Sequence, residues 1–343
     1  MKRVALATAL ACMAMGASAA DVSVYGRVDT GLLYTDDGDT QTLEMNSGGA
    51  GASRWGIKGS ENLGDGYKVG FQLEQKIGSD TGALGTAGKM FDRDAYIYVN
   101  SPYGDVRFGR SGALGGGVSG GMFAGKTSPF GVVYGNAAST KVYAVETRHD
   151  NMVRYDTPRM GGLKFAAAYS FGTDTDDAKG EGENNRYAAV GADYKAGDLN
   201  VVAVADVKMF ADESVKDTQS YKLAVNYKLD PVTLYAGYQY SKDAQKLGGK
   251  NLKGSDTDSM TLGARVKAAG GDVNFVVGYA QGENEKTEMT IKQVALGYTY
   301  KLSKAVTLYT VASFLDIESE TLASGKKTSE ETTQVMAGMY YAF

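Results

Sequence analysis

Apolar and polar residues alternate along many short segments of this chain. In the segment SYKLAVNYKL (220–229) one set of alternate positions is apolar or aromatic: Tyr221, Leu223, Val225, Tyr227 and Leu229. The positions between them are Lys222, Ala224, Asn226 and Lys228. Successive side chains of a β-strand point to opposite faces, so this period of two predicts strands with one apolar and one polar face. The chain is therefore expected to be all-β.

Sixteen segments show strand character. They are 22–34, 53–61, 66–77, 91–100, 105–110, 150–157, 163–170, 186–196, 199–210, 219–229, 232–241, 258–268, 272–281, 291–302, 306–316 and 332–343. Seven of the connections between them are tight and eight are longer and polar, and the two kinds alternate. Short turns at one end and long loops at the other are typical of outer-membrane barrels. The pattern predicts a 16-stranded antiparallel transmembrane β-barrel with short periplasmic turns and long extracellular loops.

The composition agrees with a membrane barrel. Of the four prolines, Pro102, Pro158 and Pro231 lie in tight turns and Pro129 in a long loop, so none removes a hydrogen-bond donor from a strand. The chain has 23 tyrosines beside 11 phenylalanines and one tryptophan, and tyrosine is enriched at membrane–water interfaces. After residue 20 no apolar stretch approaches the roughly 20 residues that a membrane helix needs. A soluble β-sandwich or a fibrous adhesin is the alternative, because alternation alone does not separate these classes.

The first twenty residues read as a secretory signal peptide. A basic start with Lys2 and Arg3 is followed by an apolar stretch and by small residues, with cleavage expected after Ala19 or Ala20. A lipoprotein signal that uses Cys12, the only cysteine, is the alternative. Residues 21–343 are then a single barrel domain with 34 basic and 40 acidic side chains, which gives no indication of nucleic-acid binding.

The segment GGMFAGKT (120–127) matches the phosphate-binding pattern G-x-x-x-x-G-K-[ST]. That motif works only between a buried strand and a helix, whose N-terminus holds the phosphates. Here SGALGGGVSG precedes the motif, and SPFGVVYGN, with Pro129, follows it. The match is interpreted as chance, and no nucleotide is expected as a ligand. The segment lies within the longest connection, about 111–149, which we expect to fold inward and narrow the channel that a 16-stranded barrel leaves.

Several segments resemble the general porins of Gram-negative outer membranes, in particular the neisserial and β-proteobacterial branch. They are DVSVYGRVDTGL (21–32), SRWGIKGSENLGDGYKVGFQLEQ (53–75), DRDAYIYVNSPYGDVRFGR (92–110), NMVRYDTPRMGGLKFAAAY (151–169) and the terminal YYAF (340–343). The resemblance implies a homotrimer with one pore per subunit, a third extracellular loop folded into the barrel, and passive diffusion of small hydrophilic solutes and inorganic ions. It also implies contact with outer-membrane lipid and lipopolysaccharide. Recognition of Tyr341 and Phe343 by the barrel-assembly machinery is implied as well.

The resemblance places a basic wall at the pore constriction. It corresponds here to Arg27, Arg54, Arg93 and Arg148, and Lys58 shares a strand face with Arg54. A charge on the lipid face costs about 2–4 kcal/mol at the midplane, so alternation supports a lumen-facing position for Arg27, Arg54 and Lys58. It supports one for Arg148 too, whereas Arg93 precedes YIYV, which is apolar on both faces. A lumen arginine can also pair with a carboxylate and contribute no selectivity, as Asp29 could for Arg27.

The long loop departs from the family pattern. A Pro-Glu-Phe-Gly-Gly stretch is usual in the family, and Ser128 to Val132 here contain Phe130 but no glutamate. From 111 to 145 the loop has no acidic residue, while Lys126 and Lys141 are basic; Glu146 is its first carboxylate. Rings of Arg and Lys favour anions, so an anion preference is predicted. The loop aromatics Phe123, Phe130, Tyr134 and Tyr143 are predicted to pack the loop against the wall.

Three other functions are open on the sequence. An adhesin would use acidic outer loops such as 35–39 and 174–177. An outer-membrane enzyme would need a base, and His149 is the only histidine. A substrate-specific channel would use aromatic side chains along the pore. The sequence predicts no enzymatic activity, no cofactor and no metal site.

Overall fold

The computed structural model describes residues 21–173 and 183–343. The predicted signal peptide (1–20) and the acidic stretch 174–177 lie outside the described residues. The strands are β1 Ser23–Asp36, β2 Gln41–Ser47, β3 Arg54–Gly64, β4 Tyr67–Lys76, β5 Asp94–Ser101, β6 Gly104–Gly112, β7 Arg148–Asp156, β8 Leu163–Ser170, β9 Arg186–Ala196, β10 Leu199–Met209, β11 Thr218–Leu229, β12 Val232–Leu247, β13 Lys250–Ala268, β14 Gly271–Glu283, β15 Thr287–Lys301, β16 Val306–Thr321 and β17 Lys326–Ala342. Three 3₁₀ turns, η1 Ala124–Lys126, η2 Gly135–Ala137 and η3 Ser139–Lys141, lie between β6 and β7.

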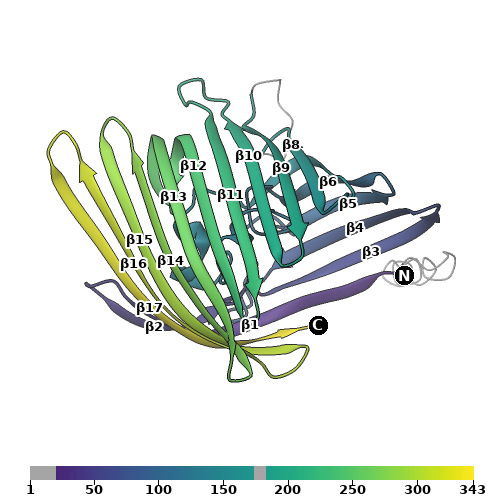
Figure 1. The fold of residues 1–343 in the computed structure, drawn as a ribbon, viewed down its shortest axis with the longest axis horizontal. Helices are drawn as coiled ribbons and strands as arrows, with labels where there is room; N and C mark the ends of the chain where they lie inside the picture. The colour runs from purple at the N-terminus through teal and green to yellow at the C-terminus, as the bar shows by residue number, and fades with distance from the viewer. Residues whose placement is uncertain (1–20, 174–182) are drawn as a thin grey trace, which may run out of the picture.

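All strands belong to one antiparallel sheet that closes on itself. From β3 to β17 each strand pairs with the next along the chain, and β1 pairs with β17 from Arg27↔Ala342 to Asp36↔Thr333. Phe343 and Gly26 exchange backbone hydrogen bonds of 3.0 and 3.1 Å at this seam. On its other edge β1 pairs first with β3 and then with β2, so β2 and β3 share one position in the wall. The result is a closed 16-stranded barrel, as predicted (Figure 1).

The faces of the strands follow the predicted alternation. On the apolar face Tyr221 is 54% and Leu262 59% exposed. On the polar face Lys222 and Thr261 are buried, at 5% and 1%. In a barrel of this size the polar face points to the lumen, so the exposed apolar residues form the outer belt. Among the described residues, no helix has the length and apolar character required to cross a bilayer.

The connection between β6 and β7, residues 113–147, folds into the barrel as predicted (Figure 1). Lumen-facing side chains of the opposite wall bind its backbone. Thr261 Oγ1 donates to Thr127 O (2.8 Å), Arg265 Nη2 to Pro129 O (2.7 Å) and Gln293 Nε2 to Asn136 O (2.5 Å). This segment is called the inward loop below. The sequence GGMFAGKT (120–127) lies within it and contains the single turn η1, and no α-helix follows, in agreement with its interpretation as a chance match.

Two parts of the fold differ from the sequence prediction. The segment 35–52, expected to be a loop, contains β2, and residues 48–53 after it turn inward and are largely buried. The strand expected at 232–241 continues to Leu247, and the strand expected at 258–268 already begins at Lys250. The pairing of these extensions has register shifts between Ser241 and Lys246. The tip of this hairpin packs inside the barrel, where Leu247 and Leu252 join Val142 of the inward loop and apolar side chains of β14–β16. A second element therefore fills part of the extracellular mouth.

The closing seam between β1 and β17 depends on paired glycines. A Cβ at Gly31 would lie 2.4 Å from Ala337 O and 2.8 Å from the Cα of Gly338, its register partner. Replacing Gly31 by Val is expected to lower the folded fraction, because the two backbones would have to separate at the seam. The change from unfolded to folded mobility on unheated gels measures this fraction. Ala312→Val, at an exposed position of β16, is the control and should leave the folded fraction unchanged.

Candidate pore constriction and channel lining

Three neighbouring cavities lie inside the barrel along the inward loop, and together they are called the path below. The upper cavity, about 650 Å³, lies beside the long-loop ends of β10–β12. It shares Val118, Val132 and Thr140 with the middle cavity of about 750 Å³. The middle cavity shares Phe130 and Tyr134, among others, with a lower cavity of about 510 Å³ at the short-turn end. The three cavities thus follow the inward loop from the long-loop end of the barrel to the short-turn end.

The middle cavity is bordered by a row of arginines on the wall formed by β3–β7. Arg54 Nε lies 3.1 Å from Glu74 Oε2, and Arg93 Nε lies 2.5 Å from Glu74 Oε1. Arg148 Nε lies 3.0 Å from Asp94 Oδ1. These three cations, predicted from sequence as wall residues, converge on two wall carboxylates. The carboxylates hold the guanidinium groups in place and neutralise only part of their charge.

Arg27 completes this row, whereas Lys58 lies apart from it. Arg27 Nη1 donates to Ala50 O (3.1 Å), and its guanidinium carbon lies 3.9 Å from the ring centre of Tyr340. Its candidate partner Asp29 is buried and accepts a hydrogen bond from Tyr309 (2.7 Å). Lys58 lies on β3 towards the short turn, exposed, with its Nζ 5.0 Å from the Tyr25 ring centre. It does not border the middle cavity within the described part of the chain.

The residues predicted on the inward loop lie at different places along the path. Lys126 borders the lower cavity, Phe130 the middle and lower ones, and Lys141 and Glu146 the upper one. Burial, together with the nearby cation Lys250, lowers the pKa of Lys141. Burial alone would raise the pKa of Glu146, but Lys208, whose Nζ lies 3.0 Å from Glu146 Oε1, together with His149 and Lys246 outweighs it, and the pKa is lowered. Glu146 is therefore a carboxylate whose charge is largely neutralised by the wall.

The aromatic residues of the inward loop pack it against the wall, as predicted. Phe123 and Tyr143 are buried and meet edge to face at 5.0 Å, and the Tyr143 hydroxyl lies 2.8 Å from Thr261 Oγ1. Phe130 contacts Tyr134, which in turn contacts Tyr309 on β16. Desolvation raises the pKa of Tyr134 to about 12, so its hydroxyl stays neutral. Phe123, Phe130 and Tyr143 are too deeply buried to offer a continuous surface to a passing solute.

The constriction is narrowed from a second side by residues 48–53. Gly48, Ala50 and Gly51 border the middle cavity beside the inward loop. The backbone N–H of Tyr134 donates to Gly49 O (2.7 Å), which ties the two segments together. A Cβ at Gly51, where φ is +146°, would lie 2.7 Å from Arg27 Nη1. The glycine-rich sequence thus allows this segment to pass close to the arginine row.

Sequence reasoning missed four charged residues of the same wall. Glu74 shares the polar face of β4 with Gln72, so alternation in FQLEQ could have identified it. Asp94, like Arg93, stands before an apolar run and carries no such signal. Arg107 donates to Ser119 O of the inward loop (3.1 Å), and Arg110 binds Asp150 (2.5 Å). Arg107 and Arg110 extend the basic wall beyond the predicted row.

All three cavities carry more cations than carboxylates. The upper one is bordered by Lys141, Lys208, Lys222 and Lys246 against Glu146 and Asp206. The middle one has Arg27, Arg54, Lys76, Arg93 and Arg148 against Glu74 and Asp94. The lower one has Arg27, Lys126, Lys195, Lys228 and Arg265 against Asp198. The whole chain has a net charge of −4, so its acidic residues are concentrated away from the path.

The remaining predicted residues lie at the barrel seam and beside the inward loop. Tyr341 and Phe343 are exposed on the outer face of the last strand, with ring centres 6.5 Å apart and the rings stacked. His149 is 1% exposed, with its ring 4.3 Å from that of Tyr187. Within residues 21–173 and 183–343, no three His, Cys, Asp or Glu side chains are grouped to hold a metal ion.

Comparison with known proteins identifies the family. A family model described as Gram-negative porin matches residues 4–319. An outer membrane porin of Bordetella pertussis is 30% identical, over 92% of this chain and 94% of its own. The anion-selective porin from Comamonas acidovorans has a similar fold, with a TM-score of 0.68, 24% identity and coverage of 95% of this chain and 100% of its own. OmpT of Vibrio cholerae, solved in a trimer form, gives a TM-score of 0.64 with 17% identity over 95% and 100%.

The channel through the barrel and these relatives lead to the same conclusion. The relatives are channel proteins of the outer membrane, and the path lined by the inward loop and the arginine row is what passive diffusion of small hydrophilic solutes requires. The chain belongs to the Gram-negative porin family and forms an outer-membrane channel.

Proposed function

We propose that this porin passes small hydrophilic anions in preference to cations. The observation that supports this most directly is the cation excess in all three cavities of the path. A channel with low-dielectric walls and charge of one sign raises the local concentration of counter-ions, and rings of Arg and Lys favour anions. The fold neighbour from Comamonas acidovorans is described as anion-selective, which agrees with the proposal.

Within the proposal, Arg27, Arg54, Arg93 and Arg148 set the selectivity at the constriction, and Lys126 and Lys141 act along the inward loop. Lys58 contributes to the short-turn vestibule rather than to the constriction. The ion pairs with Glu74 and Asp94 reduce the field of the row, but five cations against two carboxylates still leave an excess. An anion-preferring diffusion pore is therefore favoured over a neutral one.

The test is the zero-current potential of the purified protein in a planar bilayer under a KCl gradient. The wild type is expected to give the sign of an anion-selective channel. One unit charge about 5 Å from the ion path is worth about 1 kcal/mol in a water-like dielectric, or roughly fivefold in relative permeability. Arg54→Ala should reduce the anion preference by about this factor. A cation-selective wild type would contradict the proposal while leaving the channel itself intact.

Further proposals concern the assembly of the protein and its lack of enzymatic activity. A homotrimer is proposed on the family membership and on the trimer form of the OmpT neighbour. Tyr341 and Phe343, exposed at the end of β17, are proposed as the signal read by the barrel-assembly machinery. Transport without enzymatic activity or a cofactor is proposed because the relatives are channels and because His149 is buried against Tyr187. A hydrolase assay on the purified channel would test the last point.

A further inference from the structure

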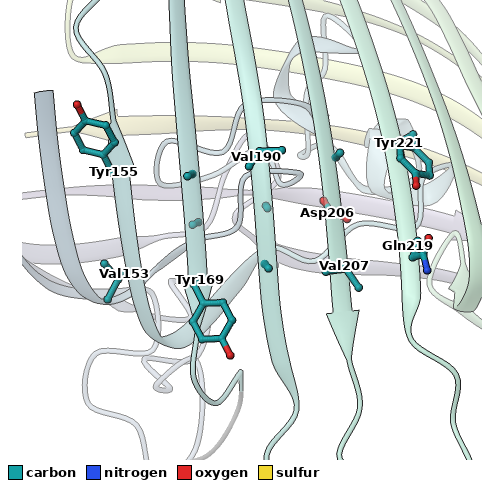
Figure 2. Close-up of a pocket in the computed structure, with 13 residues that line it drawn as sticks. Val153, Tyr155, Tyr169, Val190, Asp206, Val207, Gln219 and Tyr221 are labelled. Carbon is teal, nitrogen blue, oxygen red and sulfur yellow. The ribbon is translucent and has the colours of Figure 1, made fainter.

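Two arginines of adjacent strands lie opposite each other beside the inward loop. Arg107 of β6 and Arg154 of β7 are register partners. Figure 2 shows Val153 and Tyr155, the neighbours of Arg154, among the residues that line a groove on the outer face of the barrel. Side chains alternate along a strand, so Arg154 faces the lumen, as Arg107 does. Neither arginine borders any of the three cavities of the path, so the pair lies apart from the proposed ion pathway.

Arg154 has one guanidinium nitrogen that binds nothing in the described chain. Its Nε and Nη2 donate to Asp156 Oδ2 (2.6 Å) and Oδ1 (2.8 Å), and its side chain is only 3% exposed. Its Nη1 is buried and has no hydrogen-bond partner within residues 21–173 and 183–343. A buried charged donor without a partner is costly, and such groups in native proteins usually bind a ligand or an ion.

Arg107 is a cation without a carboxylate partner. Its Nη1 donates to Ser119 O of the inward loop (3.1 Å), and its guanidinium carbon lies 5.2 Å from the ring centre of Tyr96. Both contacts leave its charge in place, because a carbonyl oxygen and an aromatic ring carry no net charge. No carboxylate of the described chain forms an ion pair with Arg107. Like charges directly opposite each other destabilise a strand pair, so Arg107 and Arg154 together require a counter-charge.

The carboxylates nearby do not balance the two arginines. Asp156 is shared between Arg154 and Lys164, whose Nζ lies 3.0 Å from Asp156 Oδ1. Asp105, two residues before Arg107 on the same face of β6, accepts a hydrogen bond from an asparagine amide on β5 (2.7 Å) and forms no ion pair within the described residues. Three cations therefore stand against two carboxylates, and only one of these carboxylates contacts either arginine.

Gly120 of the inward loop leaves space in front of both guanidinium groups. A Cβ at Gly120, where φ is +85°, would lie 3.3 Å from Arg107 Nη1, 3.6 Å from Arg107 Nη2 and 3.4 Å from Arg154 Nη1. Beyond the chain neighbours of the glycine, these three nitrogens are the nearest atoms to that point. Guanidinium donors from two residues that converge on one point are suited to binding an anion through charge-assisted hydrogen bonds.

We propose that a single small inorganic anion of the size of chloride binds between Arg107 and Arg154, at the open side of Gly120. The burial of Arg154 excludes a bulky organic anion from its Nη1. Arg107 donates to Ser119 O, and Arg148 Nη2 donates to Ser119 Oγ (3.0 Å), so the bound anion would fix the first part of the inward loop beside the arginine row. The anion is a structural ligand and is not transported, so the proposal does not depend on the anion preference of the pore.

Bromide, which scatters X-rays anomalously, is the probe for this site. Crystals of the folded, full-length mature protein, soaked in sodium bromide, are expected to show an anomalous peak in contact with Arg154 Nη1 and the Arg107 guanidinium. Arg107→Gln should remove the peak, because it loses the charge but keeps the pair between Arg154 and Asp156. A water molecule at this point instead of bromide would overturn the site. A peak at the arginine row alone would also overturn it, while supporting the anion preference of the pore.

Thermal unfolding in solution measures the same binding without crystals. An anion that binds only the folded state raises its stability, so bromide should stabilise the wild type relative to gluconate, which is too large for the site, at equal ionic strength. Arg107→Gln should raise the half-saturating bromide concentration about tenfold, the size of one charge-assisted hydrogen bond. Gel mobility without heating checks that this variant folds, and the wild-type peak tests the site independently of it.

The matched control removes a cation at an exposed position. Arg159, after β7, binds Asp193 (2.8 Å) on the surface, and Arg159→Gln changes the net charge by the same amount as Arg107→Gln. Arg159→Gln should keep the wild-type dependence on bromide. Equal bromide dependence in Arg107→Gln and the wild type, or an equal loss in Arg159→Gln, would contradict the proposed site.

Discussion

Replacing both Arg54 and Arg148 by Glu is expected to reverse the sign of the zero-current potential. Five cations and two carboxylates border the middle cavity, so the double variant would leave three cations against four carboxylates. The four-charge change acts at the middle cavity, where low-dielectric walls concentrate the field. Potentials measured under a KCl gradient at low and high ionic strength check this, because screening should reduce the effect at high salt.

The control for charge reversal places the same change away from the path. Lys267 and Lys327 have exposed side chains, at 71% and 77%. The variant with Glu at both positions has the same net charge as the constriction variant, yet it should keep the wild-type sign. If both double variants shifted the potential equally, overall charge rather than the arginine row would govern selectivity. Unchanged ion selectivity in the Arg54/Arg148 variant would show that the arginine row does not determine selectivity.

Asp206→Ala is expected to cost about 3–5 kcal/mol in free energy of unfolding, because it leaves the buried ammonium of Lys222 without its partner. Lys222 Nζ lies 2.5 Å from Asp206 Oδ2, and its side chain is only 2% exposed. Asp206 also accepts a hydrogen bond from the Tyr187 hydroxyl (3.2 Å), which lies 3.4 Å from the N–H of Gly115 in the inward loop. Urea unfolding of the barrel in lipid vesicles measures the loss.

A matched pair on the surface separates burial from charge pairing. Asp230 and Lys267 lie 2.7 Å apart, with side chains 82% and 71% exposed. Asp230→Ala should cost less than about 1 kcal/mol, because water screens an exposed pair. The double variant Asp206→Leu with Lys222→Met should recover most of the stability, since an apolar pair of similar volume avoids burying a charge. A large loss in Asp230→Ala, or a small one in Asp206→Ala, would contradict this account.

The fold could be predicted because alternation and loop length are local signals. The alternation in 220–229 predicts, residue by residue, which side chains of β11 face the lumen and which face lipid, and the structure confirms the prediction. β2 was missed because QTLEMNS is short and its alternation includes only two apolar residues, Leu43 and Met45. The extension of β12 and β13 was missed because the register shifts after Ser241 break the period of two. Inward bending of this hairpin depends on contacts with Val142 and β14–β16, which no local pattern encodes.

The site was predictable only in part, for a similar reason. Lumen-facing arginines such as Arg54 follow from alternation within one strand. Their partners Glu74 and Asp94 come from other strands, and ion pairing across strands depends on register, which the sequence does not state. The second narrowing segment, 48–53, is short and glycine-rich, so nothing in its composition distinguishes it from an exposed loop.

The contact between Tyr134 N–H and Gly49 O has a consequence for how porins of this architecture diversify. Two irregular segments that meet inside the barrel border the middle cavity, so the space there depends on them as well as on the circumference of the barrel. Insertions, deletions or substitutions in either segment can change the size limit for solutes while every strand keeps its register. Two chains with the same number of strands can therefore sieve different molecules, and strand count alone is a poor guide to what such a channel admits.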